Sequence, residues 1–367
     1  MIEQFEIKNF RGFSEYKIDD VGQVNLLVGT NNCGKTSILE AIRLLKSEGN
    51  LYDLLSVLLR RGERIQKDTE ENRRIYGDLC RLFYGFELNP TSYFSITGHI
   101  NNQDEVISVS VHDIPIQPEL FEKEPDFSAG YHLNVRWNET KDQDFPLSLD
   151  GGLSYDYIRR RSNIKPSTVK ESKLEFVPTS SLSTQEIVAL FEEIVLTPDE
   201  DLVLDALRII EPDITRLASL GGNTRYYPLR PGNYDRGGLF VKTSKWEERV
   251  PIGSFGDGIW RLLGLILSLV AAKNGTLLID EIDTGLHHTV MSKMWKLICI
   301  TARKLNVQVF ATTHSSDCWK TLADNAVEDE FADMPIRIHR IDKNKKKPET
   351  FTNREMHLAV DREIEVR

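Results

Sequence analysis

The chain has few cysteines and no long apolar run, and these two absences exclude several classes of protein. Its 367 residues include four cysteines with no C-x-x-C pair: Cys33, Cys80, Cys299 and Cys318. This scatter argues against a disulfide framework or a cysteine zinc site and fits reduced thiols. No uninterrupted apolar stretch is long enough to span a bilayer, and the first five residues lack the pattern of a signal peptide. We therefore expect a cytoplasmic protein with no membrane partner.

An excess of basic residues is also missing. The formal net charge is −10, from 46 Lys and Arg against 56 Asp and Glu. This balance argues against a strongly basic nucleic-acid coat, but a local basic groove remains compatible with it because the field that matters is local. Apolar content of 40% and charged content of 28% are ordinary for a globular protein. The length predicts two domains, or one large domain with an insertion.

The stretch from Gly29 to Thr36 fits Gly-x-x-x-x-Gly-Lys-Thr, the phosphate-binding loop of NTPases. It follows the apolar run Val24–Val28, which predicts a short buried strand. It precedes Lys35–Lys46, where apolar residues recur at helical spacing. In a strand, glycine turn and helix of this kind, backbone N–H groups and the helix N-terminus cradle phosphate oxygens. The sequence therefore predicts an ATP site with Mg²⁺ beside it.

Each residue type in this loop has an expected role. The two glycines allow the backbone to approach phosphate closely. The Lys35 ammonium is expected to reach the β- and γ-phosphates, and the Thr36 hydroxyl is expected to bind Mg²⁺. The expected nucleotide-binding residues of this stretch are Gly29, Asn31, Asn32, Cys33, Gly34, Lys35, Thr36 and Ser37.

A second block of carboxylates lies far along the chain. The apolar run Thr276–Ile279 predicts a strand that ends at Asp280 and Glu281, which is the Walker B pattern. We expect Asp280 to hold Mg²⁺ through water and Glu281 to orient or deprotonate the attacking water. A solvent-exposed acidic pair after a strand is the alternative, and the phosphate loop upstream disfavours it.

A histidine follows the next predicted strand, Val307–Thr312. At a strand end beside a γ-phosphate, His314 could hydrogen-bond the phosphate and position the water, whereas an isolated histidine would be interpreted as structural. Its order in the chain favours the first interpretation. The predicted catalytic residues are therefore Lys35, Glu281 and His314.

The remaining patterns predict the organisation of the chain. Residues 51–86 are expected to be helical around an exposed polar stretch at 60–74, and period-two alternation predicts antiparallel strands between 93 and 137. Thr197 and Pro198 are expected to begin a helix. The run Arg159–Arg161 is a candidate contact for nucleic acid or a partner, although a solvated charge run is favoured. We expect an ATPase lobe at 1–137, a polar linker at 138–175 and a second lobe at 176–367.

The motifs together resemble the SMC/RecF/OLD branch of ABC ATPases, and within it the stand-alone OLD-like AAA-type ATPases of prokaryotes. The resemblance extends over most of the chain and is carried by Ile7–Phe13, Gly29–Ser37, Phe176–Ser181, Ser254–Gly258, Asp280–Leu286 and Thr312–Asp317. It implies an α/β fold, the ABC-ATPase head of P-loop NTPases, with a mixed sheet core, an antiparallel β subdomain and a helical subdomain. It also implies ATP and Mg²⁺ as cofactors.

The resemblance further implies assembly through the nucleotide. In this class the Gly-rich helix start of one subunit caps the ATP held by another, so a homo-oligomer is expected, with Ser254, Gly256 and Gly258 as the capping residues. The Leu-Ser-Gly-Gly-Gln motif of transporters is not present at this place. The arginine that matches Arg11 approaches nucleotide phosphate or DNA in this branch, whereas a surface arginine in a turn is the alternative here.

Two departures from the branch shape the expected partners. Residues 138–175 are too short and unpatterned for the heptad coiled coil of SMC proteins. Too few residues follow His314 for the Toprim nuclease domain of OLD proteins, so the family's biology would place a nuclease or other effector on a separate polypeptide. Antiphage defence is the setting in which related ATPases act with such effectors.

Several functions remain open from the residues alone. The first is an ATP-hydrolysing switch whose state a partner reads. The second is a scaffold that binds DNA or a partner with negligible turnover, which Glu281 disfavours only weakly. The third is the ATPase subunit of a transporter, against which the divergent Gly-rich motif argues. A GTPase is disfavoured because no Asn-Lys-x-Asp motif follows the phosphate loop.

Overall fold

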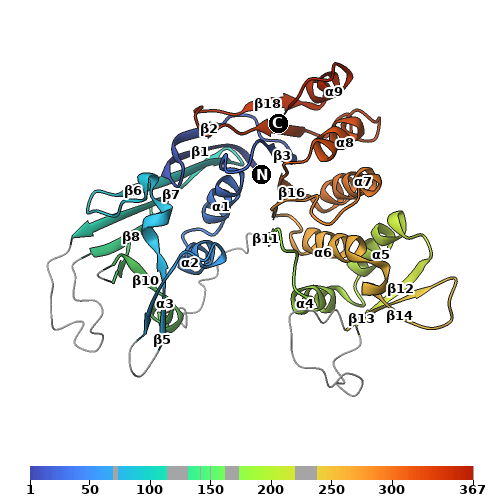
Figure 1. Cartoon of the computed structure of the whole chain (residues 1–367), viewed down its shortest axis with the longest axis horizontal. Helices are drawn as coiled ribbons and strands as arrows, with labels where there is room; N and C mark the ends of the chain where they lie inside the picture. The colour runs from blue at the N-terminus through green and yellow to red at the C-terminus, as the bar shows by residue number, and fades with distance from the viewer. Residues whose placement is uncertain are drawn as a thin grey trace. The chain divides into compact units, whose positions relative to one another are not determined.

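A computed structural model describes most of the chain as two compact units (Figure 1). The described residues are 1–68, 73–113, 131–140, 142–148, 150–161, 173–219 and 238–366. Unit 1 comprises Met1–Val21, Asn31–Ser172 and Ile341–Pro348, and unit 2 comprises Gly22–Thr30, Lys173–Arg340 and Glu349–Arg367. The boundary therefore falls within the phosphate loop, between Thr30 and Asn31. Each unit combines segments from both ends of the chain, so the units do not coincide with the lobes expected at 1–137 and 176–367. The division into those two lobes stays a prediction.

Unit 1 is built on an antiparallel six-stranded sheet in the order β2-β1-β6-β7-β8-β9. Its strands are β1 (Ile2–Phe10), β2 (Phe13–Ile18), β6 (Tyr93–Ile100), β7 (Gln103–Asp113), β8 (Tyr131–Trp137) and β9 (Gln143–Pro146). Alternation along β1 buries Phe5, Ile7 and Phe10, which is the period-two pattern of a strand with one covered face. The antiparallel strands predicted between 93 and 137 are confirmed.

Helices and a smaller sheet complete unit 1. Helix α1 (Lys35–Lys46) packs against β6 and β7 and is followed by α2 (Leu51–Arg60). The second sheet has the order β10-β5-β4, with β4 (Arg64–Asp68), β5 (Arg73–Asp78) and β10 (Gly152–Ser154). Helix α3 (Tyr155–Arg161) follows β10, and two short 3₁₀ turns, η1 (Leu79–Leu82) and η2 (Tyr84–Phe86), follow β5.

These elements correct one expectation. Residues 60–74 were expected to be an exposed polar stretch followed by a second helix, but Arg64–Asp68 and Arg73–Asp78 pair as the antiparallel strands β4 and β5. The apolar spacing of Ile75, Leu79 and Leu82 resembles a helix, but Ile75 lies in a strand and the two leucines in a 3₁₀ turn. Within the span expected as a polar linker, β9, β10 and α3 are elements of unit 1, and the bounds of the linker stay a prediction.

Unit 2 is built on a mixed six-stranded sheet in the order β11-β15-β16-β3-β17-β18. All neighbouring pairs are parallel except the last, in which β18 is an antiparallel edge strand. The strands are β3 (Val24–Val28), β11 (Leu174–Val177), β15 (Thr276–Ile279), β16 (Gln308–Thr312), β17 (Ile336–Arg340) and β18 (Glu349–Thr352). The central strands β3, β15 and β16 are buried at every position, as expected for parallel strands covered on both faces.

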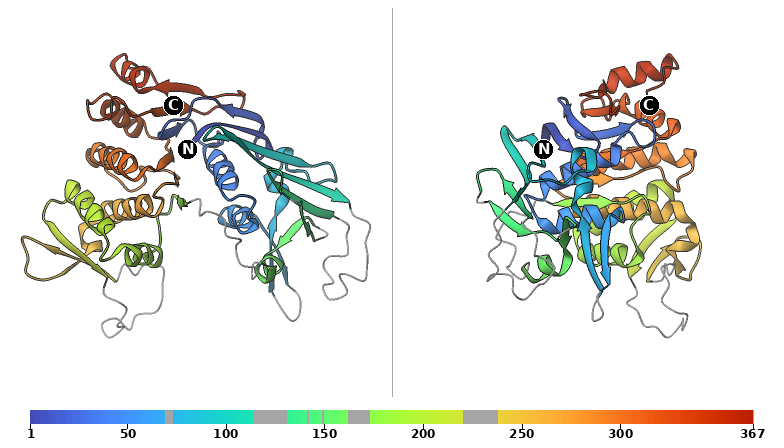
Figure 2. Two further views of the ribbon diagram at one scale, coloured as in Figure 1. Left: turned by 180° about the vertical axis from the view of Figure 1, so that it is seen from behind. Right: turned by 60° about the vertical axis from the view of Figure 1, so that its left-hand side comes forward.

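Long helices cover this sheet. Figures 1 and 2 show α6 (Asp257–Ala271), α7 (His288–Leu305), α8 (Ser316–Ala326) and α9 (Asn353–Asp361) in a row, each packed against the next. Helices α4 (Thr184–Ile194) and α5 (Pro198–Ile210) pack on α6 and on a small sheet of β12 (Ile214–Ser219), β13 (Leu239–Thr243) and β14 (Val250–Pro251). The predicted helix start at Thr197 and Pro198 is confirmed, because Thr197 accepts a hydrogen bond from the Asp199 N–H.

Two further observations bear on sequence expectations. No helix in the described ranges is long and apolar enough to cross a membrane. The strand expected at Arg225–Leu229 lies outside the described residues.

Candidate functional site

The carboxyl edge of the unit 2 sheet brings together segments that are far apart in the chain. Strands β15, β16 and β3 are parallel neighbours, with Ile279 opposite Ala311 and Thr312 opposite Leu27. Parallel strands end at one edge, where ligands bind in open α/β sheets. The first residue of the phosphate loop, Gly29, therefore leaves the sheet at the same edge as the Walker B residues and the histidine loop.

The Asp280 carboxylate is held by two threonine hydroxyls. Thr312 Oγ1 donates to Asp280 Oδ1 at 2.8 Å, and Thr179 Oγ1 donates to Asp280 Oδ2 at 3.1 Å. Thr312 closes β16, and Thr179 follows β11, so both neighbours of β15 in the sheet supply a hydroxyl. Hydroxyl donors on both oxygens fix the orientation of an anionic carboxylate. The sequence predicted no role for either threonine, although both lie at or just after the ends of the strands that flank the Walker B strand.

Glu281 has a strained backbone and a histidine partner. Its φ is +47°, a left-handed conformation that is uncommon for a side chain of this size. Its N–H donates to Thr312 Oγ1 at 2.8 Å, so one hydroxyl organises both carboxylate residues. Glu281 Oε1 lies 3.7 Å from His314 Nδ1, and both side chains are partly exposed. Backbone strain of this kind concentrates where a side chain must be aimed for function.

A buried arginine on α6 donates hydrogen bonds to several residues at this edge of the sheet. Arg261 is 3% exposed and donates hydrogen bonds to the carbonyl oxygens of Asp280 at 3.2 Å and Glu281 at 3.1 Å. It also donates to the Pro178 carbonyl at 2.8 Å and to Ser181 Oγ at 3.0 Å. Burial lowers the pKa of Arg261, and the nearby carboxylates oppose this shift. Arg261 belongs to none of the motifs in the sequence, and its position one turn after Gly258 is the only feature of the sequence that marks it.

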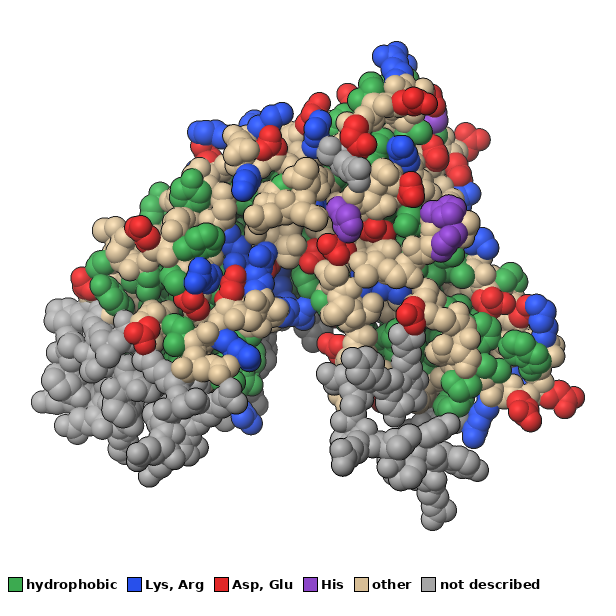
Figure 3. Space-filling model, viewed as in Figure 1, with side chains coloured by type: hydrophobic (Ala, Val, Ile, Leu, Met, Phe, Trp, Pro, Cys, Tyr) green, Lys and Arg blue, Asp and Glu red, His purple; other side chains and the backbone are tan. Residues whose placement is uncertain are grey.

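The loops after β15 and β16 are tied to each other. Thr313 Oγ1 donates to Asp283 Oδ1 at 2.6 Å and accepts from the Ser315 N–H at 3.0 Å. The ring centroids of His287 and His288 lie 4.1 Å apart at the start of α7, with the ring planes tilted by 43°. Figure 3 shows histidine side chains exposed beside acidic ones on unit 2. No group of three or more metal-ligating side chains was found among the residues the structure describes.

The Gly-rich turn predicted to cap a nucleotide precedes α6. Ser254 lies in the 3₁₀ turn η5 (Ile252–Phe255), Gly256 precedes the helix, and Gly258 lies in its first turn. Ser254 and Gly256 are exposed. Gly256 has a φ of +92°, and a Cβ placed on it would meet no atom within 4 Å. The turn is therefore an open helix N-terminus, and its contact with a partner's nucleotide stays a prediction.

In unit 1 the rest of the phosphate loop leads into α1. Asn32 and Gly34 have left-handed φ values of +61° and +102°. A Cβ on Gly34 would lie 2.4 Å from the ring of Phe13, so both backbone conformation and space require glycine there. Lys35 is buried, and its ammonium lies 3.9 Å from Cys33 Sγ. Thr36 and Ser37 follow in the first turn of the helix.

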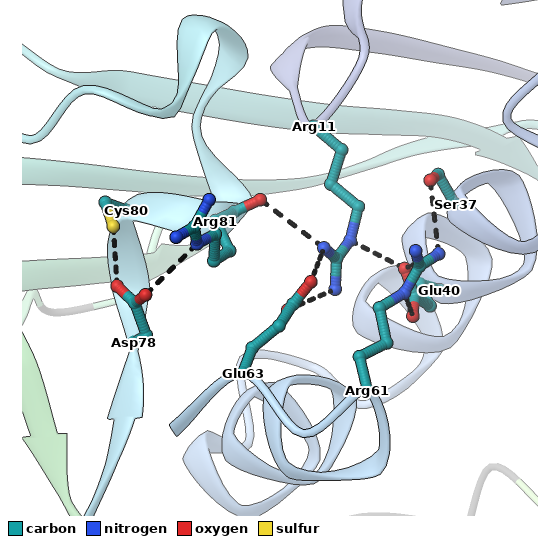
Figure 4. A network of polar contacts seen from close by, with 8 residues as sticks. All are labelled: Arg11, Ser37, Glu40, Arg61, Glu63, Asp78, Cys80 and Arg81. Atoms are coloured by element: carbon teal, nitrogen blue, oxygen red, sulfur yellow. Dashed lines mark hydrogen bonds and ion pairs between the residues drawn. The ribbon is translucent and has the colours of Figure 1, made fainter. Parts of the chain in front are cut away.

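Arg11 lies in a buried network of charges in unit 1 (Figure 4). Its Nη1 and Nη2 donate to the Glu63 carboxylate at 2.9 and 3.1 Å, and its Nε lies 2.6 Å from Glu40 on α1. Arg61 donates to both oxygens of Glu40 at 2.7 and 3.0 Å and reaches Ser37 Oγ at 3.4 Å. Burial raises the pKa of Glu40, while Arg11 and Arg61 oppose the shift.

This network bears on the expectation that Arg11 approaches nucleotide phosphate or DNA. The side chain is only 4% exposed and is paired with two carboxylates. A nucleotide or DNA contact by this arginine would require those pairs to open, because a buried guanidinium that loses its carboxylate partners is costly. Contact with phosphate stays a prediction, and the role that the structure shows for Arg11 is to link the β1–β2 turn to α1.

Comparison with known proteins identifies the class. The family described as AAA domain, putative AbiEii toxin, Type IV TA system matches residues 24–317. The chain belongs to this family, and it is a P-loop ATPase of the ABC class. The match spans the phosphate loop, the Walker B strand and the histidine loop in a single alignment. The predicted α/β fold class is thereby confirmed.

The individual proteins that resemble this chain share low sequence identity with it or match only a short stretch of it. An "ATP/GTP phosphatase" of Helicobacter pylori is 25% identical over 356 residues, which cover 90% of this chain and 90% of that protein. A "DNA replication and repair protein RecF" of Lactococcus lactis subsp. cremoris is 46% identical over 44 residues, which are 12% of each chain. A solved SmcHead, bound to the C-winged helix domain of ScpA, aligns with a TM-score of 0.49 at 14% identity over 96% of this chain and 97% of that chain.

Proposed function

We propose that the chain is an ATP-driven switch that assembles through its nucleotide and controls a separate effector. The observation that carries the proposal is the carboxyl edge of the unit 2 sheet. Asp280 and Glu281 are held there by hydrogen bonds to the Thr312 hydroxyl, at the edge from which the phosphate loop departs. His314 Nδ1 lies 3.7 Å from Glu281 Oε1 at the same edge. In the proposal, Lys35 and Thr36, which continue that loop, bind the triphosphate that these three residues process.

The chemistry follows from the residue types. Glu281 orients the attacking water and accepts its proton, and His314 donates a hydrogen bond to the γ-phosphate. Lys35 binds the β- and γ-phosphate oxygens, so that ATP and water yield ADP, phosphate and a proton. The strained Glu281 backbone and the Arg261 hydrogen bond to its carbonyl support a carboxylate that is aimed before the nucleotide arrives.

The donor set fits Mg²⁺. This ion takes hard oxygen ligands and keeps several waters, and it binds through one or two carboxylates together with phosphates. Asp280 is a carboxylate fixed by two hydroxyl donors, and Thr36 supplies a hydroxyl at the phosphate loop. These two residues would hold the ion, which would neutralise phosphate charge.

The proposal also includes assembly with a second copy of the chain and control of a separate effector. The exposed helix start at Ser254, Gly256 and Gly258 would cap the nucleotide of a second copy, so that ATP closes the assembly and hydrolysis opens it. The effector would be a nuclease in a DNA-related or antiphage system.

Nucleotide titration with sedimentation tests this proposal. Lys35→Ala should abolish ATP binding, whereas Lys8→Ala, an exposed lysine on β1, should leave it unchanged. Ser254→Glu should keep ATP binding but lose ATP-dependent association, because it adds a negative charge where γ-phosphate is expected. Unchanged ATP-dependent association in Ser254→Glu would remove the capping role from the account.

A second candidate function is an ATP-dependent scaffold for DNA or a partner with negligible turnover. The pairing of Arg11 with Glu40 and Glu63 favours it, since this network could make α1 respond to bound nucleotide without hydrolysis. Steady-state turnover measured with and without DNA separates the two functions.

A further inference from the structure

The turn between α4 and α5 exposes two apolar side chains at its tip. Val195 is 38% exposed, and Leu196 is 93% exposed, more than any other large apolar side chain in the described ranges. Leu196 also has a left-handed φ of +62°. Glycine or asparagine would adopt this backbone with less strain, so the stability of the turn does not explain a leucine at this position.

The turn itself is closely hydrogen-bonded. The Leu196 N–H donates to Glu200 Oε2 at 2.7 Å, and the Thr197 N–H donates to the Ile194 carbonyl at 3.0 Å. Thr197 Oγ1 also donates to the Ile194 carbonyl, at 2.6 Å, and Pro198 begins the next helix. The exposed leucine is therefore presented by a fixed backbone, which reduces the ordering cost when a side chain is bound.

The two helices that flank this apolar tip, α4 and α5, are rich in carboxylates. Residues 182–207 contain no lysine or arginine, and they contain seven acidic residues: Glu186, Glu192, Glu193, Asp199, Glu200, Asp201 and Asp205. Two of them form ion pairs with basic residues outside the stretch, Asp199 with Lys273 and Asp205 with Arg208. Glu193 and Asp201 are exposed, and neither forms an ion pair within the described ranges.

We propose that the Val195–Leu196 tip is a docking site for a partner protein with an apolar pocket rimmed by lysine or arginine. Removing an exposed leucine from water supplies the attraction, and the negative charge of the flanking helices selects and steers a basic rim. The same negative charge repels nucleic acid and anionic lipid surfaces, so these are outcomes of the test and not the proposed occupant. The inference deepens the proposed switch, because it rests on the separate effector and names the surface that the effector contacts.

Site-specific photo-crosslinking tests the inference in the cells that make this protein. A benzophenone amino acid is placed at position 196 and, as a matched control, at Leu358, which is 39% exposed on α9. The captured protein is identified, purified and titrated against the full chain. We expect capture at 196 and not at 358, with crosslinked peptides that carry basic residues beside apolar ones.

Variants then separate docking from folding. Leu196→Asn should weaken binding of the captured protein at least tenfold while the melting temperature stays equal or rises. Glu193→Lys with Asp201→Lys should weaken it to a similar extent, whereas Asp329→Lys with Glu363→Lys, the same change of net charge at exposed sites elsewhere, should have little effect. Raising the salt concentration should lower the affinity of the unmodified chain.

Specific results would overturn the inference. Equal labelling at 196 and 358 would do so, as would capture only of nucleic acid, lipid or a second copy of this chain. Unchanged affinity in Leu196→Asn or in the double lysine variant would also contradict it. ATP turnover of the Leu196 variants is measured separately, so a failure of docking is distinguishable from a failure of the ATPase account.

Discussion

The guanidinium of Arg261 donates a hydrogen bond to the carbonyl oxygen of Glu281 at 3.1 Å, from the helix that begins at the Gly-rich turn. The same guanidinium donates to the Asp280 carbonyl oxygen, so one side chain hydrogen-bonds the backbone of both Walker B residues. Arg261 thus connects the predicted capping turn to the predicted catalytic carboxylate within unit 2. This connection is the basis of the first prediction.

Arg261→Lys should reduce ATP turnover more than ATP binding. Lysine cannot reproduce the four hydrogen bonds, and each buried acceptor left unpaired costs about 1–3 kcal/mol. We expect kcat to fall by about tenfold or more, with little change in KM, because each 1.36 kcal/mol is about tenfold in rate. Arg303→Lys is the control, since Arg303 is a partly exposed arginine on α7. Equal kinetics of the two variants would remove Arg261 from the catalytic account.

Thr312→Val should disturb the positions of both Asp280 and Glu281, because valine has nearly the volume of threonine but lacks its hydroxyl. The hydroxyl donates to Asp280 and accepts from the Glu281 N–H, so its loss leaves that N–H unpaired, at a cost of about 1–3 kcal/mol. We expect a higher Mg²⁺ requirement and a lower melting temperature. The matched control is Thr276→Val on β15, for whose buried hydroxyl the described part of the chain shows no hydrogen bond. A Mg²⁺ dependence of Thr312→Val equal to that of the control would contradict the assignment of Asp280.

The buried Glu40 should contribute to the pH dependence of folding. Burial raises its pKa above the ordinary value of 4.5, against the opposing effect of Arg11 and Arg61. The folded chain therefore holds this proton more tightly than the unfolded chain, so the contribution of Glu40 to the unfolding free energy falls as pH rises from 4.5 through the folded pKa. Glu40→Gln should lack this fall in denaturant titrations over that range. Identical slopes for the two proteins would contradict the shift.

The sequence predicted the strands and helices that carry the chemistry with good accuracy. Val24–Val28 and Lys35–Lys46 have the predicted bounds, and α5 begins at the predicted residue, because a compact apolar run, helical periodicity and a clear N-cap are strong local signals. The pairing of β4 with β5 was missed because polar and apolar residues do not alternate in these strands, and Ile75, Leu79 and Leu82 happen to fall at helical spacing. Pairing with a distant strand, β10, is information that local periodicity does not contain.

The sequence predicted only part of the site, because contacts between distant segments are again absent from local patterns. Motif spacing placed Asp280, Glu281 and His314 at strand ends, and the parallel sheet brings those ends to one edge. The contacts of Thr179 and Arg261 with Asp280 and Glu281 are recognised only from the fold, because they join segments that are far apart in the sequence. The same holds for Arg11, whose two carboxylate partners lie on segments far along the chain.

The rate of ATP hydrolysis by purified Glu281→Gln tests the central claim most directly. Glutamine keeps the shape of the side chain but cannot accept the proton of the attacking water, so the account predicts normal ATP binding, turnover reduced by about 10²–10⁴-fold and accumulation of the ATP-bound assembly. Turnover equal to that of the unmodified chain, at the same ATP and Mg²⁺ concentrations, would contradict the catalytic role of Glu281.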